Sequence, residues 1–145
     1  MCKLVANMFK NNCSLYNTHM SGMQKKTYRV NMGKWGEERA CAFLEEKGFT
    51  IIARNVRSPY GEIDLIVSGD GKIHFVEVKT RSTSDNGFPE EAVTEQKMQH
   101  LDANVRSYLE QHPEISDNWQ MDVITVIGRP NADVQPIIDW WCDEL

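Results

Sequence analysis

Residues 62–80 read EIDLIVSGDGKIHFVEVKT, which is two β-type runs joined by a glycine-containing turn. An Asp-Gly pair between two alternating apolar runs is a strong signal for a two-residue hairpin turn. With Asp70 and Gly71 as the turn residues, Gly69 faces Lys72, and every further pair along the ladder follows from that one. The stretch therefore predicts an antiparallel hairpin of defined register.

This register would place four charged side chains on one side of the hairpin: Glu62, Asp64, Glu77 and Lys79. Asp64 would face Glu77, and Glu62 would face Lys79. Cross-strand neighbours have Cβ atoms about 4.5–5.5 Å apart, and like charges at that separation are destabilising. Lys79 can offset part of the repulsion between the two acids, and a divalent cation can offset the rest. Oxygen ligands of this kind suit Mg²⁺ or Mn²⁺ better than zinc.

Two alternatives stay open on these residues alone. A one-residue shift of register would put Asp64 and Glu77 on opposite faces. In the expected register, the alternative to a metal site is a solvent-facing strand surface with a structural Glu62–Lys79 ion pair.

The two faces of the hairpin differ in their expected burial. One face would be buried throughout: Ile63, Leu65, Val67, His74, Val76 and Val78. The carboxylate face also carries apolar residues: Ile66, Ile73 and Phe75. Acidic groups enclosed in this way cost several kcal/mol unless they are paired or bound to metal. A lysine two residues from a metal carboxylate can orient a water or stabilise a developing anion, which is the chemistry of phosphodiester hydrolysis.

The rest of the chain supplies two helices and three further strands. A helix is expected over residues 33–47, with Gly48 as its C-terminal cap, and a second over residues 94–112. β-rich runs cover residues 49–56, 121–127 and 134–138. The order α-β-β-β-α-β-β predicts an α/β fold with a mixed sheet and helices packed on it.

Length and composition agree with a single soluble domain. The chain has 145 residues, of which 41% are hydrophobic and 26% are charged. No apolar run approaches the roughly 20 residues needed to span a bilayer, so we expect no membrane protein. The cysteines form no CxxC pair, which is typical of reduced thiols in the cytoplasm and disfavours a zinc site.

Charge divides the chain into two parts. Residues 1–30 hold five basic side chains and no acidic one, and we expect them to form a poorly ordered basic extension. Residues 31–145, the expected single domain, hold the other 11 of the 16 basic side chains and all 21 acidic ones, a balance of −10. Such an acidic body argues against coating nucleic acid through bulk charge, but it is compatible with a small acidic metal site.

Four motifs follow one another along the chain. They are Gly33-x-x-Gly36-Glu37, Tyr60-Gly61-Glu62-Ile63-Asp64-Leu65-Ile66, Phe75-Val76-Glu77-Val78-Lys79-Thr80-Arg81 and Ala92-Val93-Thr94-x-x-Lys97. In this order they resemble the YraN-like family of small bacterial proteins. That family is a branch of the restriction-endonuclease-like PD-(D/E)xK nuclease superfamily and is similar to archaeal Holliday junction resolvases. The resemblance covers residues 31–139 and implies a core of αβββαβ type.

The resemblance also implies roles for individual residues. In that superfamily the acid on the second core strand and the acid of the ExK motif bind the metal, which here are Asp64 and Glu77. Lys79 matches the catalytic lysine. Glu37, on the first helix, completes the metal shell or positions water. Ile63 stands where the superfamily's signature has proline, which is a common variation.

Four residues are candidates for contacting nucleic acid: Arg81, Lys97, Arg57 and Tyr60. Arg81 follows the ExK strand and could clamp a phosphate, and Lys97 lies in the first turn of a helix, where a basic side chain gains nothing from the helix dipole. Arg57, with Arg54, could form one wall of a groove, and Tyr60 could stack on a base. Each has a structural alternative, as a surface cation or as an aromatic that packs in a turn.

Together, the residues and the resemblance predict a metal-dependent endonuclease that hydrolyses phosphodiester bonds in DNA, of branched or otherwise structured form, with Mg²⁺ or Mn²⁺ as cofactor. Two other classes stay open: a non-catalytic nucleic-acid-binding module with a nuclease fold, and a structural protein with a charged surface ladder. DNA is favoured over RNA as the partner, and a cytoplasmic location without membrane association is expected. Junction resolvases act as symmetric dimers, so the resemblance suggests a homodimer.

Overall fold

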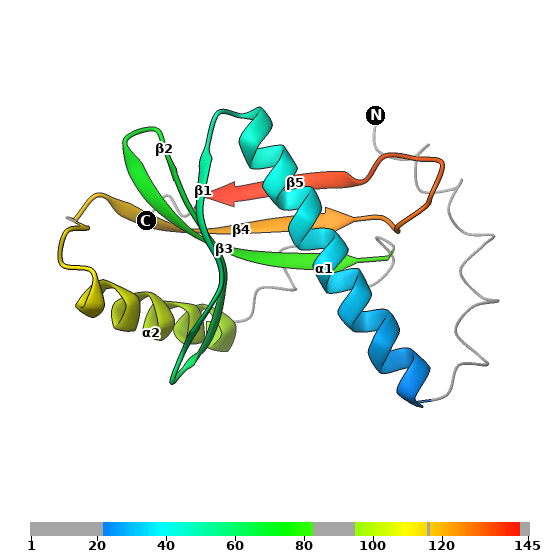
Figure 1. The fold of residues 1–145 in the computed structure, drawn as a ribbon, viewed down its shortest axis with the longest axis horizontal. Coiled ribbons are helices and arrows are strands. Elements are labelled where there is room, and N and C mark those ends of the chain that lie inside the picture. The colour runs from blue at the N-terminus through cyan, green and yellow to red at the C-terminus, as the bar shows by residue number, and fades with distance from the viewer. Residues whose placement is uncertain (1–21, 83–94, 116, 143–145) are drawn as a thin grey trace.

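A computed structural model describes residues 22–82, 95–115 and 117–142 (Figure 1). The elements follow in the order α1 (Gly22–Glu46), β1 (Thr50–Ser58), β2 (Gly61–Gly69), β3 (Lys72–Arg81), α2 (Glu95–Gln111), β4 (Trp119–Ile127) and β5 (Ile137–Cys142). The order confirms the fold class expected from the sequence. Within these residues, neither helix combines the length and the apolar character that crossing a membrane requires.

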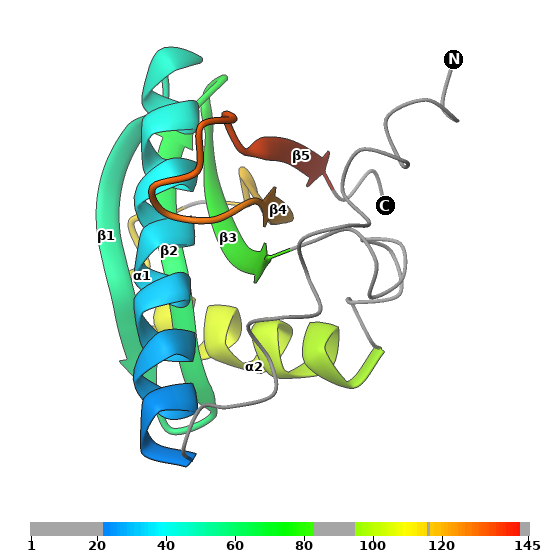
Figure 2. The same ribbon diagram turned by 90° about the vertical axis from the view of Figure 1, so that its right-hand side faces the viewer.

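The five strands form one mixed sheet in the order β1-β2-β3-β4-β5. Neighbouring strands are antiparallel except β3 and β4, which are parallel. A parallel pair needs a crossover connection, and α2 lies on the connection between these two strands. The helix α1 covers one face of the sheet and α2 covers the other (Figure 2).

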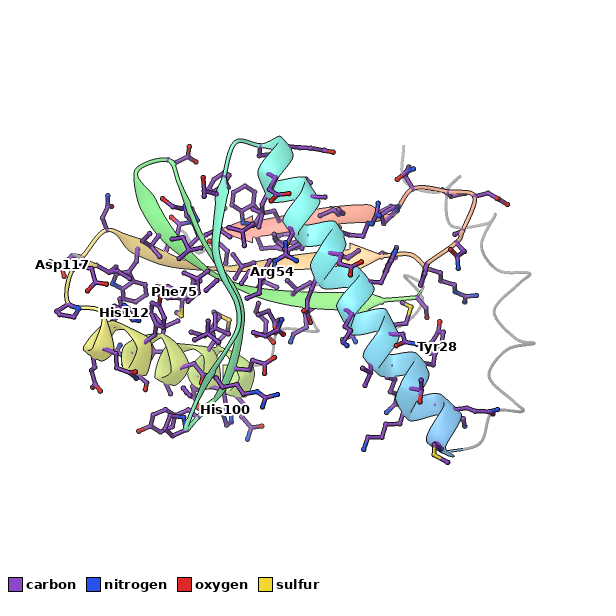
Figure 3. The ribbon with its side chains drawn as sticks, in the orientation of Figure 1. Tyr28, Arg54, Phe75, His100, His112 and Asp117 are labelled. Atoms are coloured by element: carbon purple, nitrogen blue, oxygen red, sulfur yellow. The ribbon has the colours of Figure 1, made fainter. Side chains whose placement is uncertain are left out.

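Each helix buries an apolar layer against its own face of the sheet. The layer on the α1 side consists of Ala40, Cys41, Leu44, Phe49, Leu65, Val67, Val76, Ile124 and Val126. The layer on the α2 side consists of Ile63, Ile66, Phe75, Leu101 and Val105. Figure 3 shows Phe75 beside α2. Each fully buried side chain of this size contributes about 1.5–3 kcal/mol, so the two layers hold both helices on the sheet.

The β2–β3 hairpin has the register that the sequence predicts. Its ladder runs from Gly69 opposite Lys72 to Leu65 opposite Val76. The two turn residues have φ values of 51° for Asp70 and 75° for Gly71. Two consecutive positive φ values define the two-residue turn that suits the twist of a hairpin.

The helix α1 begins at Gly22 and not at residue 33 as expected. Residues 22–30, expected in the poorly ordered extension, therefore belong to this helix, while residues 1–21 lie outside the described part of the chain. All side chains from 22 to 31 are exposed. A helix without a buried stripe has no apolar periodicity, so the pattern that located the second half of α1 could not locate the first.

The strand β5 begins at Ile137, later than the expected residues 134–138. Pro136 has no N–H to donate to a ladder, so the strand starts after it. The strand continues to Cys142 past Trp140, whose ring lies 5.1 Å from that of Phe49. Trp140 therefore covers the core.

Candidate active site

Asp64 lies at a break in the ladder between β1 and β2. The residues on either side of it, Ile63 and Leu65, pair with β1, but Asp64 does not. The residue across from it is Asn55, whose φ of 52° is in the left-handed region. Asparagine tolerates that region better than most residues. The break is thus one position long and sets Asn55 and Asp64 opposite each other.

The break corrects one expectation about the hairpin faces. Ile63 was expected on the same face as Leu65 and Val67, but it packs on the α2 side together with Ile66. The strict alternation of side chains therefore holds only on one side of the break.

Asp64 also replaces a backbone partner in the ladder between β2 and β3. The ladder pairs end at Leu65 and Val76, and beyond them the Oδ2 atom of Asp64 accepts a hydrogen bond from the N–H of Val78 at 2.7 Å. The two strands part at this point, where a side chain takes over from the backbone. One oxygen of the Asp64 carboxyl is therefore fixed by the backbone of β3.

Burial raises the pKa of Asp64 to about 7, and the negative charge of Glu77 is the second cause. The hydrogen bond from Val78 and the positive charge of Lys79 lower this pKa, while the charge of Glu37 raises it further. The charges of Glu77 and Glu37 thus act on the pKa of Asp64 in the same direction as its burial. A divalent cation would displace the proton of Asp64 and remove the repulsion between the acids.

Glu77 and Lys79 lie two residues apart on β3 and form an ion pair. Both are largely shielded, since 24% of the Glu77 side chain and 15% of the Lys79 side chain are exposed. The expected pairing of Glu62 with Lys79 is wrong, because the Nε atom of Arg57 donates a hydrogen bond to Glu62 at 3.2 Å. The ladder between β2 and β3 ends before Glu62, so Glu62 pairs only with Arg57 on β1.

Glu37 reaches the site from α1, which crosses β3 at Gly36. A Cβ atom on Gly36 would lie 1.8 Å from the Oγ1 atom of Thr80, so only glycine permits this close approach. The next residue, Glu37, accepts a hydrogen bond from the Nδ2 atom of Asn55 at 3.2 Å. One helix and three strands therefore contribute to the arrangement.

Asn55 is the residue of this site that sequence reasoning missed. It lies opposite Asp64, and its amide contacts Glu37. A signal was present, because asparagine is depleted in strands and enriched where the backbone turns left-handed. An asparagine inside the β-rich run from residue 49 to 56 therefore marked a local irregularity.

The candidate contacts for nucleic acid are spread over the fold. Arg81 is partly buried at the end of β3. Arg57 is paired with Glu62, and Tyr60 in the β1–β2 turn is 59% exposed. The side chain of Lys97, on α2, lies outside the described residues.

Arg54 lies on β1 toward α1 (Figure 3). Burial raises the pKa of the Cys41 thiol on α1, and the charge of Arg54 lowers it. Arg54 therefore lies on the α1 side of the sheet, apart from the β1–β2 turn.

The donor set decides which metal the site could hold. Among residues 22–82, 95–115 and 117–142, no three acidic, histidine or cysteine side chains come together tightly enough to form a metal-binding group. Mg²⁺, however, usually takes one or two carboxylates and completes its shell with waters and phosphate oxygens. The carboxylates of Asp64 and Glu77 fit that requirement, whereas a structural zinc would need four closely spaced ligands.

The fold and the site define a class of protein. It is an α+β domain with a restriction-endonuclease-like core, in which acids and a lysine gather where two central strands part. A model of the uncharacterised protein family UPF0102 matches residues 36–126. This span includes the three acids and the lysine of the site, which are Glu37, Asp64, Glu77 and Lys79. The chain belongs to this family, whose YraN-like motifs it carries.

Individual relatives show how far the similarity extends. A UPF0102 protein of Syntrophomonas wolfei is 42% identical over 96 residues, which is 66% of this chain and 84% of the relative. A UPF0102 protein of Chloroherpeton thalassium is 39% identical over 113 residues, or 76% and 88% of the two chains. One from Prosthecochloris aestuarii is 43% identical over 101 residues, or 68% and 78%. The family match therefore runs from Gly36 on α1 to Val126 on β4, which is far more than a single motif.

Proposed function

We propose that this protein is a metal-dependent endonuclease that hydrolyses phosphodiester bonds in DNA, with branched or otherwise structured DNA as its substrate. The observation that carries the proposal is the partly buried carboxyl of Asp64, whose pKa is raised to about 7 beside Glu77. A structural charged ladder would leave such groups in water, where their repulsion is screened. Burial next to a second acid is instead typical of a site that binds a cation.

Asp64 and Glu77 would hold Mg²⁺ or Mn²⁺, and Glu37 would complete the shell or position a water. When bound, the ion would polarise a phosphate oxygen and lower the pKa of a coordinated water. The amide of Asn55 would keep Glu37 in place.

Lys79 provides the positive charge that a phosphate group in the site requires. Its ammonium group pairs with Glu77, and it has further donors for an attacking water or for the phosphate oxygens that gain charge. In hydrolysis the water oxygen bonds to phosphorus, the bond from phosphorus to one sugar oxygen breaks, and that oxygen takes up a proton. Lys79 would stabilise the extra charge that the phosphate carries between these two events.

Glu77→Gln is expected to abolish cleavage and to leave the fold intact, because the amide has nearly the same shape as the carboxylate. The loss should exceed the roughly 10–100-fold effect of removing an outer-shell partner of a metal site. Cleavage is measured with Mn²⁺ or Mg²⁺ on linear, flapped, single-stranded and four-way-junction DNA, with Lys79→Ala alongside. Glu62→Gln makes the same chemical change on the same hairpin outside the site, and it should cleave as the wild type does.

Full activity in Glu77→Gln would refute the assignment of Glu77 as a metal ligand.

A second candidate function is a nucleic-acid-binding module without turnover, and one observation favours it. The ion pair of Glu77 with Lys79 and the raised pKa of Asp64 let the site reach charge balance without a cation. DNA binding that EDTA leaves unchanged, with no cleavage at any metal concentration, would support that module.

Asn55→Gly is expected to keep the fold, because glycine adopts a φ of 52° without strain. It removes the amide that contacts Glu37, so Mn²⁺ affinity should fall about 10–100-fold, as for other outer-shell partners. Asn55→Ala should show the same loss and, in addition, about 1–2 kcal/mol lower stability, because alanine is strained in the left-handed region. Titration calorimetry and urea unfolding separate the two effects. Equal Mn²⁺ affinity in Asn55→Gly and wild type would show that Glu37 does not depend on this contact.

A further inference from the structure

The N-terminal half of α1 is a basic helix that the described part of the chain leaves uncovered. Residues 22–31 are all exposed, and they include Lys25, Lys26 and Arg29. Within the described residues none of these cations forms an ion pair. Cations in the first turns of a helix are also disfavoured by the helix dipole. Their placement therefore does not serve the stability of the fold.

Helix geometry places part of this segment in line with Glu37. At 3.6 residues per turn, Lys26 precedes Glu37 by close to three full turns and Gly33 precedes it by about one, so all three share one face of α1. The rise of about 1.5 Å per residue puts Lys26 roughly 16 Å from Glu37 along the axis. That distance corresponds to roughly five nucleotides of one strand of duplex DNA.

No contact within the described part of the chain requires glycine at position 33. A Cβ atom at this position would meet nothing within 4 Å, in contrast to Gly36, which Thr80 excludes from having one. Glycine inside a helix is destabilising relative to alanine. Within the described residues, there is therefore room beside the partly buried Gly33, one turn from Glu37, where the backbone of another molecule could approach.

The opposite face of α1 borders the β4–β5 loop. Tyr28 and Trp35 lie there with Pro130 and Asn131 of the β4–β5 loop around a shallow hollow. Figure 3 shows Tyr28 on that side of the helix. Within the described residues, one face of the helix thus borders this hollow, while Lys26 on the other face is exposed.

We propose that this open face of α1, from Lys26 to Gly33, binds the phosphate backbone of DNA next to the active site; it is called the α1 phosphate face below. Charge selects the occupant, because Lys26 lies on this face and Arg29 about 60° around the helix from it, and such cations on an otherwise acidic domain attract a polyanion. The inference rests on the proposed function for the site that the strand would lead to, but binding itself requires no cleavage.

Lys26→Glu and Lys25→Glu form a matched pair of variants on the full chain. They change charge equally at exposed neighbouring positions, but Lys25 points about 100° away from Lys26. Fluorescence anisotropy with labelled duplex and four-way-junction DNA in EDTA measures binding without turnover. We expect Lys26→Glu to weaken binding about 10-fold and to lower the salt dependence by about one counterion. Lys25→Glu should weaken binding less than about 3-fold.

Gly33→Ala and Gly33→Leu test the close approach. Both replacements favour helix, so both should raise the thermal midpoint by roughly 2–4 °C. DNA affinity should nevertheless fall, about 10-fold for leucine and less for alanine, because the side chain blocks the strand. Unchanged affinity in a stabilised Gly33→Leu would overturn the proposal, and so would equal effects of Lys25→Glu and Lys26→Glu.

The proposal and the nuclease assignment can fail separately. A difference between the two lysine variants without cleavage by the wild type would support the α1 phosphate face and refute the nuclease. Cleavage by the wild type, with equal DNA binding by the two lysine variants, would support the nuclease and refute the α1 phosphate face. A dimer that Lys26→Glu converts to a monomer in sedimentation would show that a second copy of the chain occupies the face, which would overturn the proposal.

Discussion

Asp64→Asn is expected to abolish cleavage and, at the same time, to stabilise the metal-free protein at pH 8. The amide keeps the size of the carboxyl, and its oxygen can still accept the hydrogen bond from the N–H of Val78. The strands should therefore keep their positions. What disappears is a buried negative charge beside Glu77, which the proposed activity needs and the metal-free fold does not. Function and stability oppose each other at this side chain.

The size of the stabilisation follows from the pKa of Asp64, which burial raises from 3.8 to about 7 in the folded protein. Between these pH values the folded state binds more protons than the unfolded state. The contribution to stability is therefore complete at low pH and is lost as the pH rises through 7. At about 1.4 kcal/mol per pKa unit, the wild type loses about 4 kcal/mol over the whole range. Asparagine does not titrate and avoids this loss.

Urea unfolding in EDTA at pH 5 and pH 8 measures the effect. The advantage of Asp64→Asn over wild type should be about 2–3 kcal/mol larger at pH 8 than at pH 5. Glu62→Gln is the matched control, because Glu62 lies on the same strand but is paired with Arg57 outside the site. An advantage that is independent of pH would contradict the raised pKa of Asp64. Retained cleavage in Asp64→Asn would contradict its catalytic assignment.

The pairs from Gly69 with Lys72 to Leu65 with Val76 could be predicted because they depend on local turn chemistry. Asp70 and Gly71 adopt the positive φ values that a two-residue turn needs, and each pair along the ladder follows from the turn. The same reasoning failed at Glu62. The strands part at Asp64, and beyond that point the turn no longer determines which residues face each other.

Side-chain contacts between separate helices and strands could not be predicted from the sequence. Asn55 on β1 contacts Glu37 on α1, and neither residue belongs to a repeating pattern that involves the other. Periodic patterns report which face of an element is buried, and they do not tell which side chain reaches across from another element. The exposed half of α1 was missed for a related reason, since it buries nothing and so has no pattern.

Asp122 is expected to be one of the most sensitive positions for stability. It is 1% exposed on β4 and lies 2.7 Å from the Nδ1 atom of His74 on β3. Its carboxylate also accepts hydrogen bonds from the Nε2 atom of Gln120 at 2.8 Å and from the Nε1 atom of Trp140 on β5 at 3.1 Å. One side chain thus connects three neighbouring strands on the α1 side of the sheet. No part of this network belongs to the candidate active site.

Asp122→Ala should therefore lower the free energy of unfolding by about 3–5 kcal/mol, because the Nδ1 atom of His74 and the Nε1 atom of Trp140 both lose their carboxylate partner. Asp122→Asn retains an acceptor and should lose less, about 1–3 kcal/mol. Asp117→Asn, at an exposed position, is the control and should stay within about 0.5 kcal/mol of wild type in urea unfolding. A loss below about 1 kcal/mol in Asp122→Ala would mean that water replaces the carboxylate easily. The packing of Trp140 against Phe49, and not the hydrogen-bond network, would then be what holds β5 on the sheet.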